Sequence, residues 1–439
     1  MPHLEEVARR ADWVGRGIAP SSAGVPALGT LLTGLRPWQH QALYDGRPGL
    51  APDLLTLAEA LRARGYTTGG YPGDPWSQDF FGYGQGFDAF IRLGHGRRAL
   101  DRLANLGSGR HFVWVHLPQP GVPWVRHDEY LSRLGPGAPD LPRRIQPAQL
   151  EPFFDPATPL SPGLRRRFLS MYRLSAAWAD ERLGQLLDAL RASGQWDRTL
   201  LVVTSIHGEE IGDHGQILHG GNLGRAGLEV PLVIKLPKGS PLRLRPAATQ
   251  RVATARIWAT LVEAAGGEPP PAAAPSLFRD APPEVLSELY LTNGTNRFSL
   301  VETAPDPPDP ALQLLQESRF APSEPDYFRA RQEAMQPRPR RAPPAPPSPV
   351  FTRLAEAFGM TPPLAGTGRG AAMWQLERWL PGGGTVRVED PRKAADLARR
   401  LALEWSRFVP DELPPDGEST EWNGPEKHRG RWRRHRVDG

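Results

Sequence analysis

Histidines and carboxylates are concentrated just after one apolar stretch of the chain. Residues 199–205 read TLLVVTS, and the polar side chains that follow are His207, Glu209, Glu210, Asp213, His214 and His219. A further histidine, His116, lies in a second apolar stretch at residues 111–118. Imidazoles transfer protons near neutral pH and are common zinc ligands. We expect the carboxylates Glu209, Glu210 and Asp213 to form a solvated turn and His207 to be a capping or core-edge residue. The alternatives are an acid–base centre, or a cluster of His116, His207, His214 and His219 able to hold zinc.

The apolar stretches at residues 111–118, 199–205 and 230–236 predict buried strands, because they are short and rich in aromatic and β-branched residues. Helical periodicity predicts helices over 54–61, 164–193 and 253–265. The first 110 residues otherwise read as alternating helix and turn. The expected fold is α/β, with a mostly parallel central sheet and helices on both faces. Ligands of such sheets bind beyond the carboxyl ends of strands, where the histidines lie.

Composition divides the chain into three parts. Residues 1–268 form the predicted α/β domain. Residues 269–410 combine Pro-rich linkers (269–275, 304–310 and 337–349) with a small C-terminal α+β subdomain, which has expected strands in 285–302 and 371–389 and a helix over 392–408. Residues 411–439 form a basic tail that is expected to be disordered.

Charge and cysteine content exclude several classes of site. The formal net charge is +5, and residues 425–439 alone contribute +4. That tail could contact nucleic acid or anionic lipid, but a solvated tail is the preferred interpretation. Only four of the 53 basic residues are lysines: Lys235, Lys238, Lys393 and Lys427. The absence of cysteine excludes disulfides and thiolate chemistry.

No apolar run has the length of about 18 residues that a membrane-spanning helix needs. As written, the N-terminus also lacks the apolar core of a signal peptide. The expected location is the cytoplasm, or the periplasm or exterior if translation begins upstream of Met1. Oligomeric state does not follow from the sequence.

Several motifs occur in the order typical of one family. Residues 204–215 read TSIHGEEIGDHG and are followed by His219-Gly220 and then Glu229-Val230-Pro231, while residues 24–34 read GVPALGTLLTG. This pattern resembles the sulfatase family of the alkaline-phosphatase-like superfamily, with its D-H-G motif, its R-V-P motif and its nucleophile motif ending in L-L-T-G. Residues 55–71, 111–124 and 256–270 also resemble family segments. The resemblance covers residues 1–275 well and 276–408 faintly.

The resemblance implies a hydrolase of sulfate or phosphate esters. Family members hold a divalent metal with two N-terminal carboxylates and the first two residues of D-H-G, so His207 falls at a metal-ligand position. His116 and His219 fall at positions that act on the ester or its leaving group. If the protein is active, the implied cofactor is Ca²⁺, Mg²⁺, Mn²⁺ or Zn²⁺.

The same resemblance reveals departures at the reactive positions. Gly24 stands at the nucleophile, Leu28 at its arginine partner, and Ile206 at the Asp of D-H-G. Gln119 and Gly121 replace an Asp and a His of the middle motif, and Glu229 replaces the Arg of R-V-P. Residues 1–4 match the segment after the family's first strand, so that strand and its carboxylates are absent. No cofactor is therefore expected as written.

Two functional hypotheses follow. The first is a pseudoenzyme that binds an anionic small molecule, a sugar ester or a partner protein, with no clear role for nucleic acid. The alternative is an active metal-dependent hydrolase or transferase with a rearranged centre built on His116, His207, His214 and His219. Ser21 and Ser22 are weaker candidates for a replacement nucleophile. Asp180 is expected to be a surface or capping residue of the long helix.

Overall fold

The computed structural model describes most of the chain up to residue 302 and short segments beyond it. The described residues are 1–43, 49–74, 77–92, 97–136, 138–154, 158–215, 217–247, 250–281, 284–290, 295–302, 312–319, 373–379 and 385–387. They belong to two compact units. The first comprises residues 1–289, 302–311 and 379–385, and the second comprises 290–301, 312–378 and 386–439. None of the described helices is long and apolar enough to cross a membrane.

A four-stranded sheet lies in the middle of the first unit. Its order is β11 (Arg251–Ala253), β1 (Trp13–Ile18), β10 (Glu229–Lys235) and β7 (Leu201–Thr204). β1 pairs in parallel with β11, whereas β10 runs antiparallel to both β1 and β7. This sheet is therefore mixed.

A separate three-stranded sheet in the first unit is wholly parallel. Its order is β3 (Ala89–Phe90), β2 (Tyr66–Tyr71) and β4 (Arg110–Val115). The first unit also contains two short antiparallel ribbons. They pair β5 (Trp124–Val125) with β6 (Arg144–Ile145) and β8 (Glu210–Ile211) with β9 (Ile217–Leu218).

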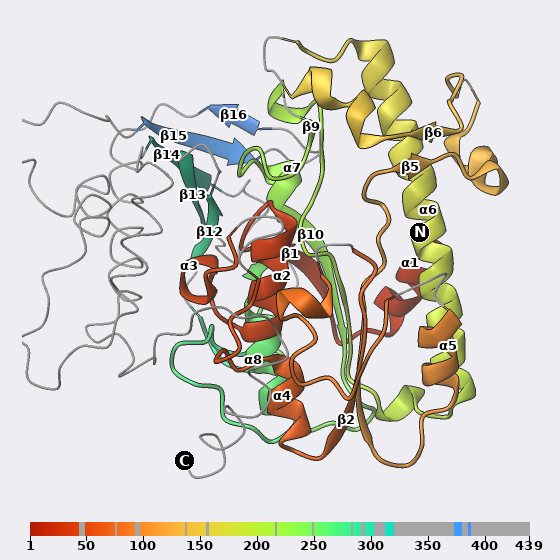
Figure 1. Ribbon diagram of the computed structural model, residues 1–439, viewed down its shortest axis with the longest axis vertical. Helices are drawn as coiled ribbons and strands as arrows, with labels where there is room; N and C mark the ends of the chain where they lie inside the picture. Colours follow the sequence, from red (N-terminus) through yellow and green to blue (C-terminus); the bar gives the residue numbers. More distant parts are fainter. Residues whose placement is uncertain are drawn as a thin grey trace, which may run out of the picture. The chain divides into compact units, whose positions relative to one another are not determined.

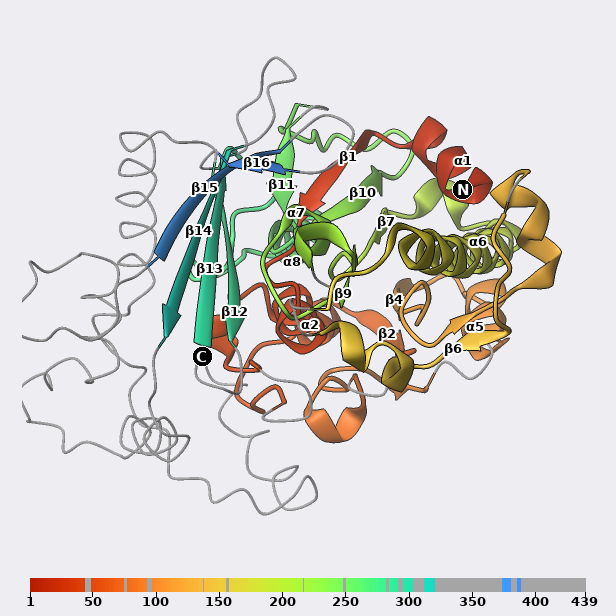
Figure 2. The ribbon, with the colours of Figure 1, turned by 90° about the horizontal axis from the view of Figure 1, so that it is seen from above.

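Helices cover both faces of these sheets (Figure 1; Figure 2). On one face lie α1 (Pro2–Arg10), α5 (Arg97–Ala104) and the long α6 (Pro162–Ala192), which contacts both of the others. On the other face lie α2 (Gly24–Thr33), α4 (Leu57–Arg62) and α8 (Arg256–Ala264), all three in mutual contact. The shorter α3 (Pro37–His40) and α7 (Arg225–Leu228) lie next to α2 and immediately before β10, respectively. This arrangement confirms an α/β fold with two helical layers.

Two features of the predicted sheet were wrong. The expectation of helix and turn in the first 110 residues omitted β1 and β2, whose sequences WVGRGI and YTTGGY contain glycines that interrupt the apolar pattern. The expectation of a mostly parallel sheet is only partly correct, because β10 is reversed. The described residues between β7 and β10 contain no long crossover helix. The chain therefore re-enters the sheet at the end where β7 finishes, and β10 runs in the opposite direction.

Strands from the later part of the chain are mostly antiparallel neighbours. β12 (Glu284–Tyr290) belongs largely to the first unit, where the Glu288 amide donates to the Pro20 carbonyl. In the second unit β13 (Thr295–Glu302), β14 (Leu312–Arg319) and β15 (Met373–Trp379) pair antiparallel in that order, and β16 (Thr385–Arg387) follows. Strands are thus present in both segments predicted to hold them. Residues 269–275 contain no helix or strand. The predicted helix over 392–408, the other two linkers and the tail lie outside the described residues.

Candidate functional site

His207 lies at the carboxyl end of β7, beside the first residue of α2. Its Nδ1–H donates to the Gly208 carbonyl at 2.7 Å, which leaves Nε2 as the acceptor of the neutral ring. Burial holds the pKa of His207 well below its usual value, and repulsion from the charge of His219 lowers it further. His207 is therefore neutral at pH 7. Its Nδ1 is bonded to the backbone, and its Nε2 is the nitrogen that can accept a hydrogen bond.

The His219 ring lies close to the His207 ring, tilted by 34° from it, and is oriented by a carboxylate. The two imidazole centroids are 4.1 Å apart, and His219 Nδ1 lies 2.9 Å from Glu209 Oε1. The Glu209 side chain is only 5% exposed. Leu218, just before His219, adopts a left-handed backbone conformation with φ of 64°. The backbone just before His219 is therefore strained, and this strained conformation places the His219 ring beside His207.

His116 directly follows the last residue of β4 and lies near His207. The two are close enough for His116 to contribute to the lowered pKa of His207. Burial also lowers the pKa of His116, while the nearby Asp74 raises it. The His116 ring stacks on Trp114 with centroids 5.9 Å apart, and its Nδ1 has no partner among the described residues. Three of the four predicted histidines are thus gathered in one place. The fourth, His214, lies in the 3₁₀ turn Asp213–Gly215, and its side chain is outside the description.

The first residue of α2 leaves an opening in this site. A Cβ added to Gly24 would lie 3.7 Å from His207 Nε2 and 3.9 Å from Ile206 Cδ1, both ordinary contact distances. The position therefore has room for a side chain but supplies none. Around it lie one neutral imidazole, one carboxylate-bound imidazole and the hydrocarbon of Ile206.

A family model described as Sulfatase matches residues 1–103 and 97–267, which is more than half of the chain. The chain belongs to the sulfatase family. It thereby falls within the alkaline phosphatase superfamily, as the resemblance of its motifs predicted.

Individual relatives support the same placement. The multifunctional alkaline phosphatase superfamily protein PehA of Trinickia caryophylli is 30% identical over 145 residues, which cover 31% of this chain and only 26% of PehA. The phosphonate monoester hydrolase SpPMH of Silicibacter pomeroyi has a similar structure, with a TM-score of 0.56 and 20% identity over 94% of this chain and 90% of SpPMH. BT4656, solved with its substrate D-glucosamine-2-N,6-O-disulfate, has a TM-score of 0.55 and 14% identity over 82% of this chain and 94% of its own. At these identities the two structures establish the fold alone.

The metal of the sulfatase family does not fit the described side chains. Among them, no group of three or more His, Asp or Glu residues is arranged to hold a metal ion. Ile206 supplies no oxygen at the position of a family ligand, and the Nδ1 of His207 is used on a backbone carbonyl. We therefore derive no reaction step through a metal.

Glu229, which the sequence places at the arginine position of the R-V-P motif, is surrounded by arginines from three elements. Arg16 Nη1 and Arg225 Nη2 lie 2.6 and 2.9 Å from its Oε1, and Arg251 Nε lies 2.9 Å from its Oε2. Burial alone would raise the pKa of Glu229, but the hydrogen bonds from Arg225 and Arg251 hold it below its usual value. The motif comparison predicted a departure from the family at Glu229. It did not predict that Arg16, Arg225 and Arg251 would surround this carboxylate.

Other candidates have structural partners. The solvated-turn interpretation was wrong for Glu209 and Glu210, since both side chains are buried, Glu210 with 2% exposure. Asp213 accepts from Arg165 at 3.0 Å and from the Ile211 amide. Ser21 and Ser22 are buried, with Ser22 Oγ donating to the Asn222 carbonyl and Ser21 Oγ accepting from the Ala23 amide. Nothing in these contacts frees either serine to act as a nucleophile.

Proposed function

We propose that this sulfatase-family protein binds an anionic ester at the histidine site and has lost most or all of the hydrolysis that its family performs. The observation that carries the proposal is the opening at Gly24. The family's nucleophile would stand where this chain has no side chain, directly opposite the free nitrogen of His207.

Loss of the covalent step follows from the residue types. An ester hydrolase of this kind needs a nucleophilic oxygen or sulfur together with positive charge to stabilise the transition state. Glycine supplies no nucleophile, and Ile206 removes a hard oxygen ligand from the expected metal position. A base at His207 without a residue to deprotonate can act only on a water molecule or on a ligand hydroxyl.

Binding of an anion is consistent with what remains. His219 is held by the buried Glu209 carboxylate, so its ring is fixed before any ligand arrives. The ligand class we propose is a sulfate or phosphate ester of a sugar. Support comes from BT4656, whose solved complex contains a disulfated glucosamine, and from the phosphonate monoester hydrolase with the same fold.

The test combines metal content, turnover and binding on one purified sample. Elemental analysis after dialysis would accompany assays of aryl sulfate and aryl phosphate with added Ca²⁺, Mg²⁺, Mn²⁺ or Zn²⁺. Isothermal titration with glucosamine 6-sulfate would measure binding to the unmodified chain and to His207→Ala and His219→Ala. The control is His111→Ala, which removes a histidine at the start of β4, away from the site.

We expect no turnover above the His207→Ala background, with binding that both site variants weaken and the control retains. Failure of the sulfated sugar to bind would overturn the binding role. Stoichiometric metal with His207-dependent turnover would instead support the alternative, an active hydrolase or transferase with a rearranged centre. The close approach of the His207 and His219 rings is the observation that favours that alternative.

We also propose that the first strand of the family sheet is missing from residues 1–439. Two sheet edges support this proposal. β4 is the last strand of the three-stranded sheet and β7 the last strand of the four-stranded sheet, and neither has a second neighbouring strand among the described residues. Gln195 Nε2 lies 3.4 Å from the Gly107 carbonyl before the two strands begin, and His116 and His207 follow where they end. The strands thus run side by side in one direction. Their apolar residues, Phe112 to Val115 and Leu201 to Val203, are all partly exposed.

Hydrogen exchange of the existing chain tests whether the two edges are open. We expect one set of amides in each of β4 and β7 to exchange faster than the amides of β10, which has a partner on both sides. Equal protection of all three strands would contradict a missing neighbour.

A further inference from the structure

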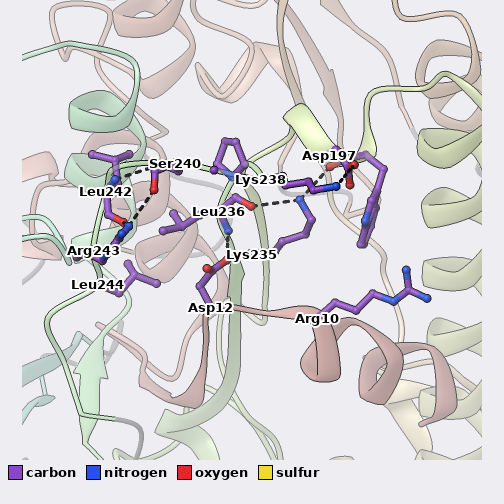
Figure 3. Close-up of a pocket in the computed structure, with 13 residues that line it drawn as sticks. Arg10, Asp12, Asp197, Lys235, Leu236, Lys238, Ser240, Leu242, Arg243 and Leu244 are labelled. Atoms are coloured by element: carbon purple, nitrogen blue, oxygen red, sulfur yellow. Dashed lines mark hydrogen bonds and ion pairs between the residues drawn. The ribbon is translucent and has the colours of Figure 1, made fainter.

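A cavity of about 620 Å³ is lined by residues of α1, of β10 and of the loop after β10 (Figure 3). It lies at the opposite end of the four-stranded sheet from the histidines. The strand register fixes its place. Lys235, in the cavity wall, pairs with Leu201 at the start of β7, whereas the histidine site follows the other end of β7 at Thr204. The walls come from the end of α1, from residues 196–197 and from the loop 236–244.

The charge of the wall is positive. Four cationic side chains line the cavity against two carboxylates, a net charge of +2: Arg10, Lys235, Lys238 and Arg243 against Asp12 and Asp197. Two of the four lysines in the whole chain are among them.

Part of this wall is rigid. The Lys235 ammonium donates to the carbonyls of Trp196, Thr199 and Leu236 at 2.9, 3.1 and 3.2 Å, and it lies 5.0 Å from the centre of the Trp196 ring. Asp12 accepts from the Leu236 amide at 2.6 Å. Lys235 and Asp12 are therefore occupied in fixing the shape of the cavity, and they leave ligand binding to the other charged groups.

Arg243 and Lys238 have capacity left for a ligand. Arg243 Nη1 donates to the carbonyls of Ser240 and Leu242, while its Nε and Nη2 make no hydrogen bond within the described part of the chain. The Lys238 side chain is 81% exposed and lies 3.7 Å from Asp197, a loose ion pair. Two nitrogens of one guanidinium can bind two oxygens of a phosphate or sulfate group together.

We propose that this cavity binds a small molecule bearing an oxyanion, namely a phosphate or sulfate monoester about the size of a sugar. The volume falls within the roughly 300–1,000 Å³ of small-molecule sites. Arg243 and Lys238 contact the oxyanion, and Arg10 contributes to the field from the end of α1. The proposal is independent of the histidine site, because the two lie at opposite ends of β7.

Isothermal titration with glucose 6-phosphate, inorganic phosphate and inorganic sulfate tests it. Arg243→Ala should weaken binding of glucose 6-phosphate about tenfold, since one charged contact is lost. The matched control is Arg245→Ala. It removes the same charge two residues further along the chain, and the Arg245 side chain does not line the cavity. Lys238→Gln supplies a second variant on an exposed side chain, and thermal melting verifies that each variant folds.

Tighter binding of the sugar ester than of either inorganic anion would show that the cavity recognises more than the oxyanion. Tighter binding of the inorganic ions would identify a free anion as the ligand. Three results would overturn the proposal: no binding of any probe, equal weakening by Arg243→Ala and Arg245→Ala, or loss of binding in His207→Ala, which would place the ligand at the other site.

Discussion

Two glycines of α2 have opposite surroundings. A Cβ on Gly24 would meet nothing closer than 3.7 Å, whereas a Cβ on Gly29 would lie 2.6 Å from Cε1 of His40. His40 is buried, and its Nδ1 accepts from the Ala42 amide at 3.1 Å. A side chain would thus be accommodated at Gly24, whereas at Gly29 the absence of one is a packing requirement.

Substitution of each glycine by alanine should separate these two roles. In a helix interior alanine normally stabilises by about 1 kcal/mol relative to glycine. At Gly29 we expect the opposite sign, a destabilisation of about 1–3 kcal/mol from overpacking against His40. Gly24→Ala should stay within about 0.5 kcal/mol of the unmodified chain, as is usual away from such contacts. Urea denaturation of both variants measures the difference, and a stabilised Gly29→Ala would contradict the packing.

The buried His40 should make the fold sensitive to acid. Burial lowers the pKa of His40 from 6.5 to about 3, so the folded chain keeps this ring neutral while the unfolded chain protonates it. Stability is therefore present above about pH 6.5 and is lost as the pH falls toward 3, at up to about 1.4 kcal/mol per pH unit. His40→Gln should have a shallower loss of unfolding free energy between pH 6 and pH 4 than the unmodified chain. Identical slopes would remove His40 as the cause.

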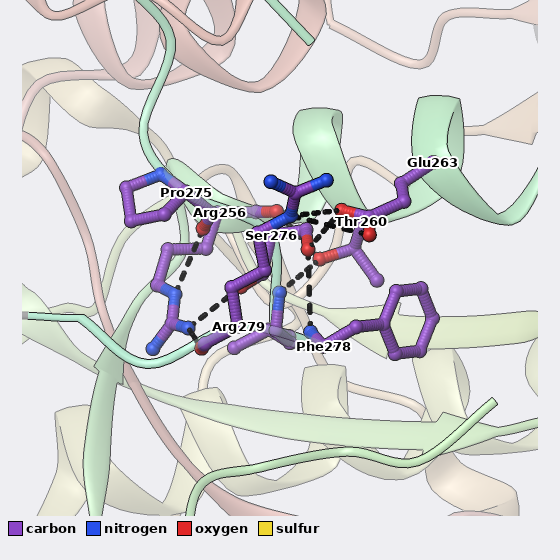
Figure 4. A network of polar contacts seen from close by, with 8 residues as sticks. Arg256, Thr260, Glu263, Pro275, Ser276, Phe278 and Arg279 are labelled. Carbon is purple, nitrogen blue, oxygen red and sulfur yellow. Dashed lines mark hydrogen bonds and ion pairs between the residues drawn. The ribbon is translucent and has the colours of Figure 1, made fainter. Parts of the chain in front are cut away.

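At the scale of elements, α8 is joined to the segment after it by one buried arginine (Figure 4). Arg256 donates to the carbonyls of Pro275, Ser276 and Arg279 at 3.0, 2.7 and 2.6 Å. Burial lowers the pKa of Arg256 to about 10, so it stays charged at neutral pH. Arg279 also pairs with Glu263 at 3.1 Å, but its side chain is 61% exposed. The buried cation thus satisfies three carbonyls of a segment that has no helix or strand.

Arg256→Met and Arg279→Met should differ strongly in unfolding free energy. The first leaves buried carbonyls without donors and should cost about 3 kcal/mol or more, since each buried unpaired polar group costs about 1–3 kcal/mol. The second removes an exposed ion pair worth at most about 1 kcal/mol. Thermal and urea denaturation of the two variants tests the contrast. Similar losses would mean that the buried contacts of Arg256 stabilise this segment no more than the exposed ion pair of Arg279 does.

At the scale of the whole first unit, contacts distant in sequence tie the ends of elements together. Asp180, fully buried in α6, accepts from the His3 and Leu4 amides at 3.2 and 2.9 Å. It thereby caps α1, whose own N-cap residue Met1 makes no side-chain hydrogen bond. The capping alternative for Asp180 is confirmed, although the helix that it caps is another one.

Asp180→Ala should destabilise the protein by about 1–2 kcal/mol, the usual cost of losing an N-cap. The matched control is Asp188→Ala on the same helix, whose side chain is 73% exposed and should matter by less than about 0.5 kcal/mol. Hydrogen exchange should locate the Asp180 effect in the amides of α1. An unchanged α1 in Asp180→Ala would contradict the capping role.

The sequence by itself determined the elements whose patterns are local. The apolar runs of β4, β7 and β10 and the periodicity of α4, α6 and α8 were predicted to within a few residues, because each signal lies in consecutive side chains. The motif order also indicated the family. The division of the chain at residue 268 stays a prediction.

Only the tertiary structure decided the features that depend on neighbours far away in sequence. β1 and β2 contain glycines and become strands through their partners, and β10 is reversed because of where the chain re-enters the sheet. The burial of Glu209, the close approach of the His207 and His219 rings and the three arginines around Glu229 likewise join separate segments. Spacing along a chain records which side chains are available, but distance and burial arise only when the elements pack.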